Sequence, residues 1–107
     1  MDAAIRNSWN GLSVAAVSDA LDRCGIEGQC LGLRPLSTSF RLLGAAVTVR
    51  YAPRGGESGT VGDYIDDVPP GAVVVLDNGG RPDATVWGDI LTEVAHRRSV
   101  SGTVIHG

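Results

Sequence analysis

The residues best suited to chemistry are concentrated between Asp77 and Asp89. This stretch opens with the turn-forming run Asp-Asn-Gly-Gly-Arg-Pro-Asp and ends where apolar residues continue at helical spacing. Glycines such as Gly79 and Gly80 let the backbone approach a ligand closely. Unpaired backbone amides at the start of a helix attract an anion, because they carry the positive end of the helix dipole. The pattern therefore predicts a binding site for a small anion such as a carboxylate or a phosphate.

A plainer interpretation of the same residues stays open. In it, residues 78–80 form only a turn, and Asp83 or Asp89 only caps a helix. Trp87 either lines the pocket or packs in the core. His106, at the end of an expected strand, is more typical of a structural histidine than of a catalytic one.

Helical periodicity identifies three segments that must support this stretch. Residues 13–24 form the clearest helix, with Ser13 as its cap and Gly25 as its stop. A short helix is expected over 60–67, and a longer one through the apolar residues of 86–95. The longer helix directly follows the candidate site.

Three further segments read as strands. Alternation predicts a half-buried strand over 42–51, with one face formed by Val47, Val49 and Tyr51. The continuous apolar run 72–76 is typical of a central strand, and the chain turns apolar again at 104–105. Strand, loop, helix and strand in this order favour a parallel pair with a right-handed crossover. Ligands of open α/β sheets bind beyond the carboxyl ends of the strands, which is where 77–89 would lie.

Composition excludes several classes of function. The 107 residues carry a formal net charge of −3, which suits one domain over 1–107 and argues against a nucleic-acid surface. The nine basic residues are all arginine, so a mechanism through a lysine Schiff base is excluded. No apolar run approaches a membrane span, and the opening residues lack the pattern of a signal peptide, so a cytoplasmic location is expected. The spacing of Cys24 and Cys30 predicts reduced thiols.

Three stretches in sequence order resemble the RraA-like family, which includes the 4-hydroxy-4-methyl-2-oxoglutarate aldolases. They read SVAAVSDALDRCG, RLLGAAVTVRYAP, and PPGAVVVLDNGG followed by VWGDILTEVAHRRSVSGTVIHG. The resemblance runs from about Ser13 to Gly107. It implies an α/β fold of the swivelling β/β/α sandwich type, incomplete at the C-terminus, assembled as homotrimers or hexamers with active sites between subunits. It also implies a Mg²⁺- or Mn²⁺-dependent aldolase.

Asp89 matches the first acidic residue of the family's site. In the family's aldolases an Arg-Asp pair follows this aspartate after twenty residues, and here the pair would begin at the third position beyond Gly107. The resemblance therefore implies that this sequence carries half of the site. Asp89 would act in catalysis, in proton transfer or by holding a metal-bound water. The residues implied to bind the substrate are Gly79, Gly80, Gly88, Ile90 and Leu91.

The activity implied by the resemblance is a lyase acting on small 2-keto acids. It would cleave 4-hydroxy-4-methyl-2-oxoglutarate or decarboxylate oxaloacetate, giving pyruvate. An alternative is a non-catalytic regulator of the same fold that binds an RNA-degrading endonuclease, and a further one is an inactive fragment. The loop 54–60 departs from the family pattern and is given no role. We expect the 107-residue chain to be oligomeric or poorly soluble, and to lack aldolase activity in isolation.

Overall fold

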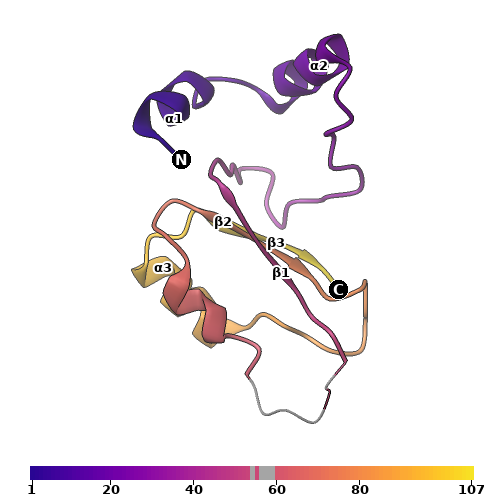
Figure 1. The fold of residues 1–107 in the computed structure, drawn as a ribbon, viewed down its shortest axis with the longest axis vertical. Coiled ribbons are helices and arrows are strands. Elements are labelled where there is room, and N and C mark those ends of the chain that lie inside the picture. Colours follow the sequence, from indigo (N-terminus) through magenta and orange to yellow (C-terminus); the bar gives the residue numbers. More distant parts are fainter. Residues whose placement is uncertain (54, 56–59) are drawn as a thin grey trace. The chain divides into compact units, whose positions relative to one another are not determined.

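The computed structural model describes residues 1–53, 55 and 60–107. Over these residues the chain forms two compact units, 1–41 and 42–107, which are described separately (Figure 1). The glycine-rich loop expected at 54–59 lies outside the described residues, apart from Gly55.

The first unit contains two helices and a following irregular segment. Helix α1 spans Ala3–Trp9 and helix α2 spans Val14–Cys24. The Ser13 hydroxyl caps α2 by accepting a hydrogen bond from the Ala16 amide at 3.1 Å, and Gly25 ends it with a φ of 66°. The predicted ends of α2 are thus confirmed, whereas α1 was not predicted.

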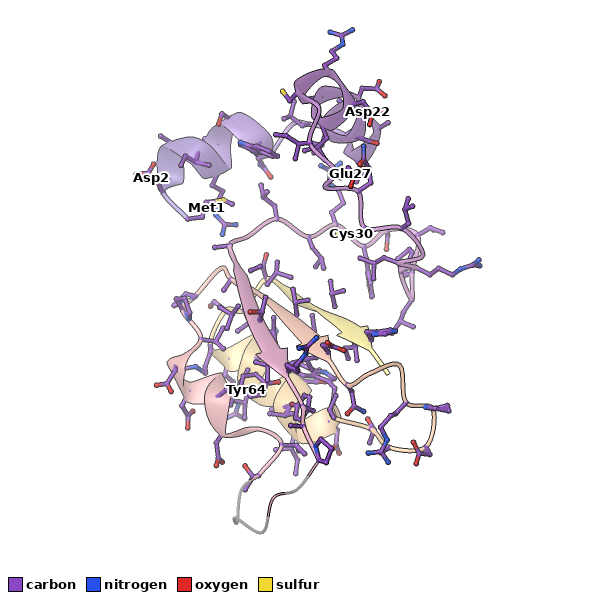
Figure 2. The ribbon with its side chains drawn as sticks, turned by 45° about the vertical axis from the view of Figure 1, so that its right-hand side comes forward. Met1, Asp2, Asp22, Glu27, Cys30 and Tyr64 are labelled. Carbon is purple, nitrogen blue, oxygen red and sulfur yellow. The ribbon has the colours of Figure 1, made fainter. Side chains whose placement is uncertain are left out.

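The side chains of the first unit remain largely in contact with solvent. No residue of 1–41 is buried, so the apolar stripe that predicted α2 does not form a core within this unit. Both thiols are free and exposed, in agreement with the expectation, and Figure 2 shows Cys30 on the segment after α2. Exposed large apolar residues of this unit include Trp9, Leu12, Val14, Leu31, Leu36 and Phe40.

A parallel sheet organises the second unit. Its strands are β1 (Ala46–Arg50), β2 (Val73–Asp77) and β3 (Gly102–His106), with β2 in the centre and both pairs parallel. The predicted central strand and the predicted parallel pair are confirmed, and the chain has the α/β class expected. The first strand is shorter at both ends than the predicted 42–51.

Two helical segments connect these strands. A 3₁₀ helix, η1, spans Asp63–Asp67 between β1 and β2, and α3 spans Asp89–Arg97 between β2 and β3 (Figure 1). The helix predicted from Val86 onward therefore starts too early. Val86 is apolar because it is buried in the core, and its spacing to Ile90 happens to fit a helix. It lies before the first helical residue, Asp89.

The core of the second unit lies between the sheet and these helices. Val74 and Leu76 point to one face of β2 and are 0% and 1% exposed. The predicted face of β1, with Val47 and Val49 beside them, packs against this core, and Figure 2 shows Tyr64 of η1 near the same region. The buried apolar residues that form the cluster are Ile65, Val68, Ala72, Val74, Leu76, Val86 and Ala95.

Within the described residues, no helix is both long and apolar enough to cross a membrane.

Candidate functional site

The start of α3 offers backbone donors without acceptors inside the helix. Gly88 precedes the helix in an extended conformation and supplies no capping side chain. The first hydrogen bond of the helix runs from the Thr92 amide to the Gly88 carbonyl oxygen at 3.0 Å. The amides of residues 89–91 therefore have no intrahelical acceptor, and the helix dipole favours an anion at this point.

Asp89, the first residue of α3, already uses one of these donors. Its Oδ1 accepts a hydrogen bond from the Ile90 amide at 2.9 Å. Both residues are exposed, and the Ile90 side chain is 75% exposed, so solvent reaches this end of the helix. An anion that binds to the Ile90 amide must displace the Asp89 carboxylate, whereas the Leu91 amide requires no such exchange.

A small hollow of about 210 Å³ lies at this end of α3 and is the hollow referred to below. Its size suits a small molecule better than a large ligand. It is lined by Val61, Thr85, Val86, Trp87, Gly88, Asp89, Ile90 and Leu91. A separate hollow of about 490 Å³ lies along the same helix and is lined by Asp89, Ile90, Glu93, Val94 and Arg97.

Trp87 both packs in the core and lines the hollow, so the two interpretations of this residue are compatible. Its indole Nε1–H donates a hydrogen bond to Oγ1 of Thr92 at 2.8 Å. The Thr92 hydroxyl in turn donates to the Gly88 carbonyl oxygen at 2.7 Å. The aromatic wall and the start of α3 are therefore joined by hydrogen bonds.

Two tyrosines lie behind the hollow, and one of them contacts a residue that lines it. The Tyr51 hydroxyl donates a hydrogen bond to the Val61 carbonyl oxygen at 2.6 Å, which holds Val61 in place. Burial, with a smaller contribution from the nearby Tyr51, raises the pKa of Tyr64 well above its usual value. The Tyr64 hydroxyl has no hydrogen-bond partner among the described residues, and the ring packs against the core.

The glycine loop after β2 is fastened to the end of β3. The amides of Asn78 and Gly80 both donate to the His106 carbonyl oxygen, at 2.9 and 3.3 Å. Gly79 and Gly80 have φ values of 66° and 68°, a conformation that glycine adopts without strain. Asn78 is 7% exposed, and its side-chain amide donates to the Ala84 carbonyl oxygen at 3.1 Å. These contacts give the loop a defined structure.

The last residues of the three strands form a charged row. Arg50, Asp77 and His106 are in register, and the Arg50 Nε lies 3.1 Å from the Asp77 carboxylate. The pKa of Asp77 is lowered, first by the hydrogen bond from the Gly79 amide and then by the Arg50 guanidinium. The sequence pattern does not reveal this row, because only the register of the strands brings the three residues together.

The predicted site residues divide into two groups in the structure. Gly88, Asp89, Ile90 and Leu91 line the hollow at α3, whereas Gly79 and Gly80 belong to the loop fastened to His106 and are not among the residues that line it. Neither aspartate occupies the capping position of the helix, although the Asp89 carboxylate accepts one amide of its first turn. Gly88 occupies the capping position, Asp89 is the first helical residue, and Asp83 pairs with Arg81 at 2.9 Å.

The described residues supply only part of what a metal ion needs. Among them, no group of three or more His, Cys, Asp or Glu side chains is placed to hold a metal. Asp89 offers a carboxylate oxygen, which is the kind of ligand that Mg²⁺ and Mn²⁺ prefer. Asp89 could therefore provide one ligand to such an ion, but the described residues do not form a metal centre by themselves.

Together, the parallel sheet and the helix that follows its central strand define an α/β domain with a small hollow at the start of α3. Residues 14–107 match the family described as RraA-like, Aldolase/RraA. The chain belongs to this family, as its sequence motifs predicted.

Two known proteins are similar to this chain over most of its length. Protein DlpA of Legionella pneumophila subsp. pneumophila (strain Philadelphia 1) is 49% identical over 96 residues, which cover 87% of this chain and 16% of that protein. An uncharacterized protein from Pseudomonas syringae pv. tomato str. DC3000, known from its crystal structure, is 40% identical with a TM-score of 0.89. The match covers 100% of this chain and 48% of that structure, so the chain spans less than half of each relative.

Proposed function

We propose that this chain contributes to a divalent-metal-dependent lyase site that acts on small 2-keto acids and gives pyruvate. The proposed reactions are cleavage of 4-hydroxy-4-methyl-2-oxoglutarate and decarboxylation of oxaloacetate. The observation that carries the proposal is the hydrogen bond from the Ile90 amide to Asp89 at a helix start that lines a small hollow. Membership of the RraA-like family, whose description includes aldolases, supports it.

The proposed chemistry needs stabilisation of negative charge on the substrate. Cleavage of the bond between the carbons α and β to the ketone of a 2-keto acid leaves the electron pair of that bond on an enolate of pyruvate. The sequence contains no lysine that could hold these electrons as an iminium. A bound Mg²⁺ or Mn²⁺ ion would supply Lewis-acid stabilisation.

The chain's own residues have two tasks in this proposal. The Leu91 amide and the dipole of α3 hold the carboxylate of the substrate. When that carboxylate also takes the Ile90 amide, Oδ1 of Asp89 is released from its hydrogen bond. Asp89 then accepts the proton of the substrate hydroxyl group, directly or through water, as the carbon–carbon bond breaks. In this proposal the site is completed by assembly into homotrimers or hexamers.

Binding of oxalate, a planar dianion that resembles the enolate of pyruvate, tests the proposal. We expect isothermal titration calorimetry to show that Mg²⁺ raises the oxalate affinity of the chain at least about tenfold, a difference of about 1.4 kcal/mol. Asp89→Ala should remove this gain, whereas the control Asp83→Ala, which alters an exposed aspartate that does not line the hollow, should retain it. Oxalate binding without any Mg²⁺ dependence, or a gain that survives in Asp89→Ala, would overturn the proposal.

A further inference from the structure

Thr92 joins two parts of the hollow that have different chemistry. Its hydroxyl donates its only proton to the Gly88 carbonyl oxygen and accepts the indole N–H of Trp87. The distances are 2.7 and 2.8 Å, both typical of well-formed hydrogen bonds. A hydroxyl with this arrangement cannot rotate without losing both contacts.

The first consequence concerns the orientation of the Thr92 side chain. The Gly88 carbonyl oxygen accepts from both the amide and the hydroxyl of Thr92, so its two lone pairs are occupied. This carbonyl points along α3 toward Thr92 and away from the amides of residues 89–91, which remain the donors at the start of the helix. The bond to Gly88 therefore fixes the side from which the Thr92 oxygen receives the indole N–H of Trp87.

The second consequence concerns the aromatic wall. The Trp87 backbone is held by Thr85, whose hydroxyl donates to the Trp87 carbonyl oxygen at 2.8 Å. The Trp87 ring is held by Thr92. Since backbone and ring are fixed separately, the indole has a single orientation relative to the amides of α3.

We propose that Thr92 is a positioning residue of the α3 site, which holds the Trp87 ring as a wall of the hollow and thereby supports carboxylate binding at the adjacent amides. This inference rests on the proposed function. It adds a residue to the site that neither the family resemblance nor the lining of the hollow assigns. Thr92 is exposed, so its replacement leaves the buried core intact.

The test uses the fluorescence of Trp87 together with oxalate affinity. The chain has two tryptophans, so Trp9→Phe makes Trp87 the only reporter. In this parent, Thr92→Val removes the hydroxyl with little change of shape, and Thr92→Ser restores it. The control Thr48→Val removes an exposed threonine hydroxyl from β1. Circular dichroism checks that each variant is folded.

In Thr92→Val we expect acrylamide to quench Trp87 more strongly and oxalate affinity in the presence of Mg²⁺ to fall about fivefold, the effect of one lost hydrogen bond. Thr92→Ser and Thr48→Val should stay within about twofold of the parent on the same scale. Trp87→Phe keeps an aromatic ring but lacks the N–H donor, so its oxalate affinity in the presence of Mg²⁺ should fall as that of Thr92→Val does. If Thr92→Val fails to fold, Trp87→Phe tests the positioning role of Thr92 in its place.

Unchanged affinity in both Thr92→Val and Trp87→Phe would overturn the positioning role while leaving the proposed function intact. Failure of the parent to bind oxalate with Mg²⁺ would overturn the proposed function, and the role of Thr92 in carboxylate binding with it. The quenching of Trp87 separates the two cases, because it reports the Thr92 contact without any ligand.

Discussion

Asp77 and His106, the last residues of two neighbouring parallel strands, are in register, and Nδ1 of His106 lies 3.5 Å from the Asp77 carboxylate. The same carboxylate accepts the Gly79 amide at 2.9 Å and the Arg50 guanidinium at 3.1 Å. One side chain thus connects the ends of three strands with the loop that follows the central one. This relationship makes the loop after β2 sensitive to the charge of Asp77.

The first prediction concerns pH. Folding lowers the pKa of Asp77 below its ordinary value of 3.8, so the folded state favours the ionised carboxylate. The resulting stabilisation is fully present above that ordinary value and is lost as pH falls through the lower folded value. Asp77→Asn should therefore have a lower free energy of unfolding than the unaltered chain at pH 6, and the difference should shrink toward pH 3. Urea unfolding at both pH values measures this, and a constant difference would contradict the assignment.

The second prediction concerns the core of the second unit. Leu76 is 1% exposed, whereas Ile105, its registered neighbour on β3, is 40% exposed. Leu76→Ala should cost about 2–5 kcal/mol of unfolding free energy, because it leaves a cavity between sheet and helices. Ile105→Ala should cost clearly less. Equal losses in chemical denaturation would show that the helix-covered core does not dominate the stability of this unit.

The third prediction concerns a close backbone approach before β1. A Cβ atom on Gly44 would lie 2.2 Å from the Gly71 carbonyl oxygen, a backbone atom that cannot move aside cheaply. Gly44→Ala should therefore lower the unfolding free energy by about 1–3 kcal/mol. Gly11→Ala, where a Cβ atom meets nothing within 4 Å, is the matched control and should be nearly neutral. Thermal unfolding of the two variants distinguishes crowding from a general effect of losing glycine.

The fourth prediction separates the two roles of Asp89. Its carboxylate occupies the Ile90 amide, so in the absence of metal it competes with a bound anion and repels it. In metal-free buffer, Asp89→Ala should bind oxalate several-fold more tightly than the unaltered chain, although it loses the gain in affinity that Mg²⁺ provides. The metal-free oxalate affinity of Asp89→Asn should lie between those of the unaltered chain and Asp89→Ala. Calorimetric titration in the presence of a chelator measures the effect, and weaker metal-free binding by Asp89→Ala would contradict the competition.

Local signals predicted the elements with strong ends or strong patterns. The apolar run of β2 and the Ser13 and Gly25 caps of α2 were sufficient to locate these segments. The short helix α1 was not predicted, although Asp2 caps it by accepting the Ala4 amide at 2.7 Å. A single capping residue before a seven-residue helix is a weak signal, because short helices depend on their surroundings.

The site was predictable only where its residues are close in sequence. Gly88 to Leu91 are consecutive, so the family resemblance identified them together, and helix periodicity covered Ile90 and Leu91. The contribution of Val61 to the hollow and the charged row at the strand ends depend on strand register and on packing between distant segments. The Trp87–Thr92 hydrogen bond spans only five residues, but it requires the exact start of α3, which the sequence placed too early.

The charged row also disfavours a shift in the register of the sheet. Side chains alternate between the two faces of a strand, so shifting β2 by one residue would turn Asp77 toward the apolar core and Leu76 toward water. Arg50 and His106 would at the same time lose the carboxylate between them. An insertion or deletion of one residue in β2 would therefore be resisted by burial of a charge as well as by loss of packing. In a sheet of three short strands, this row therefore favours a single alignment.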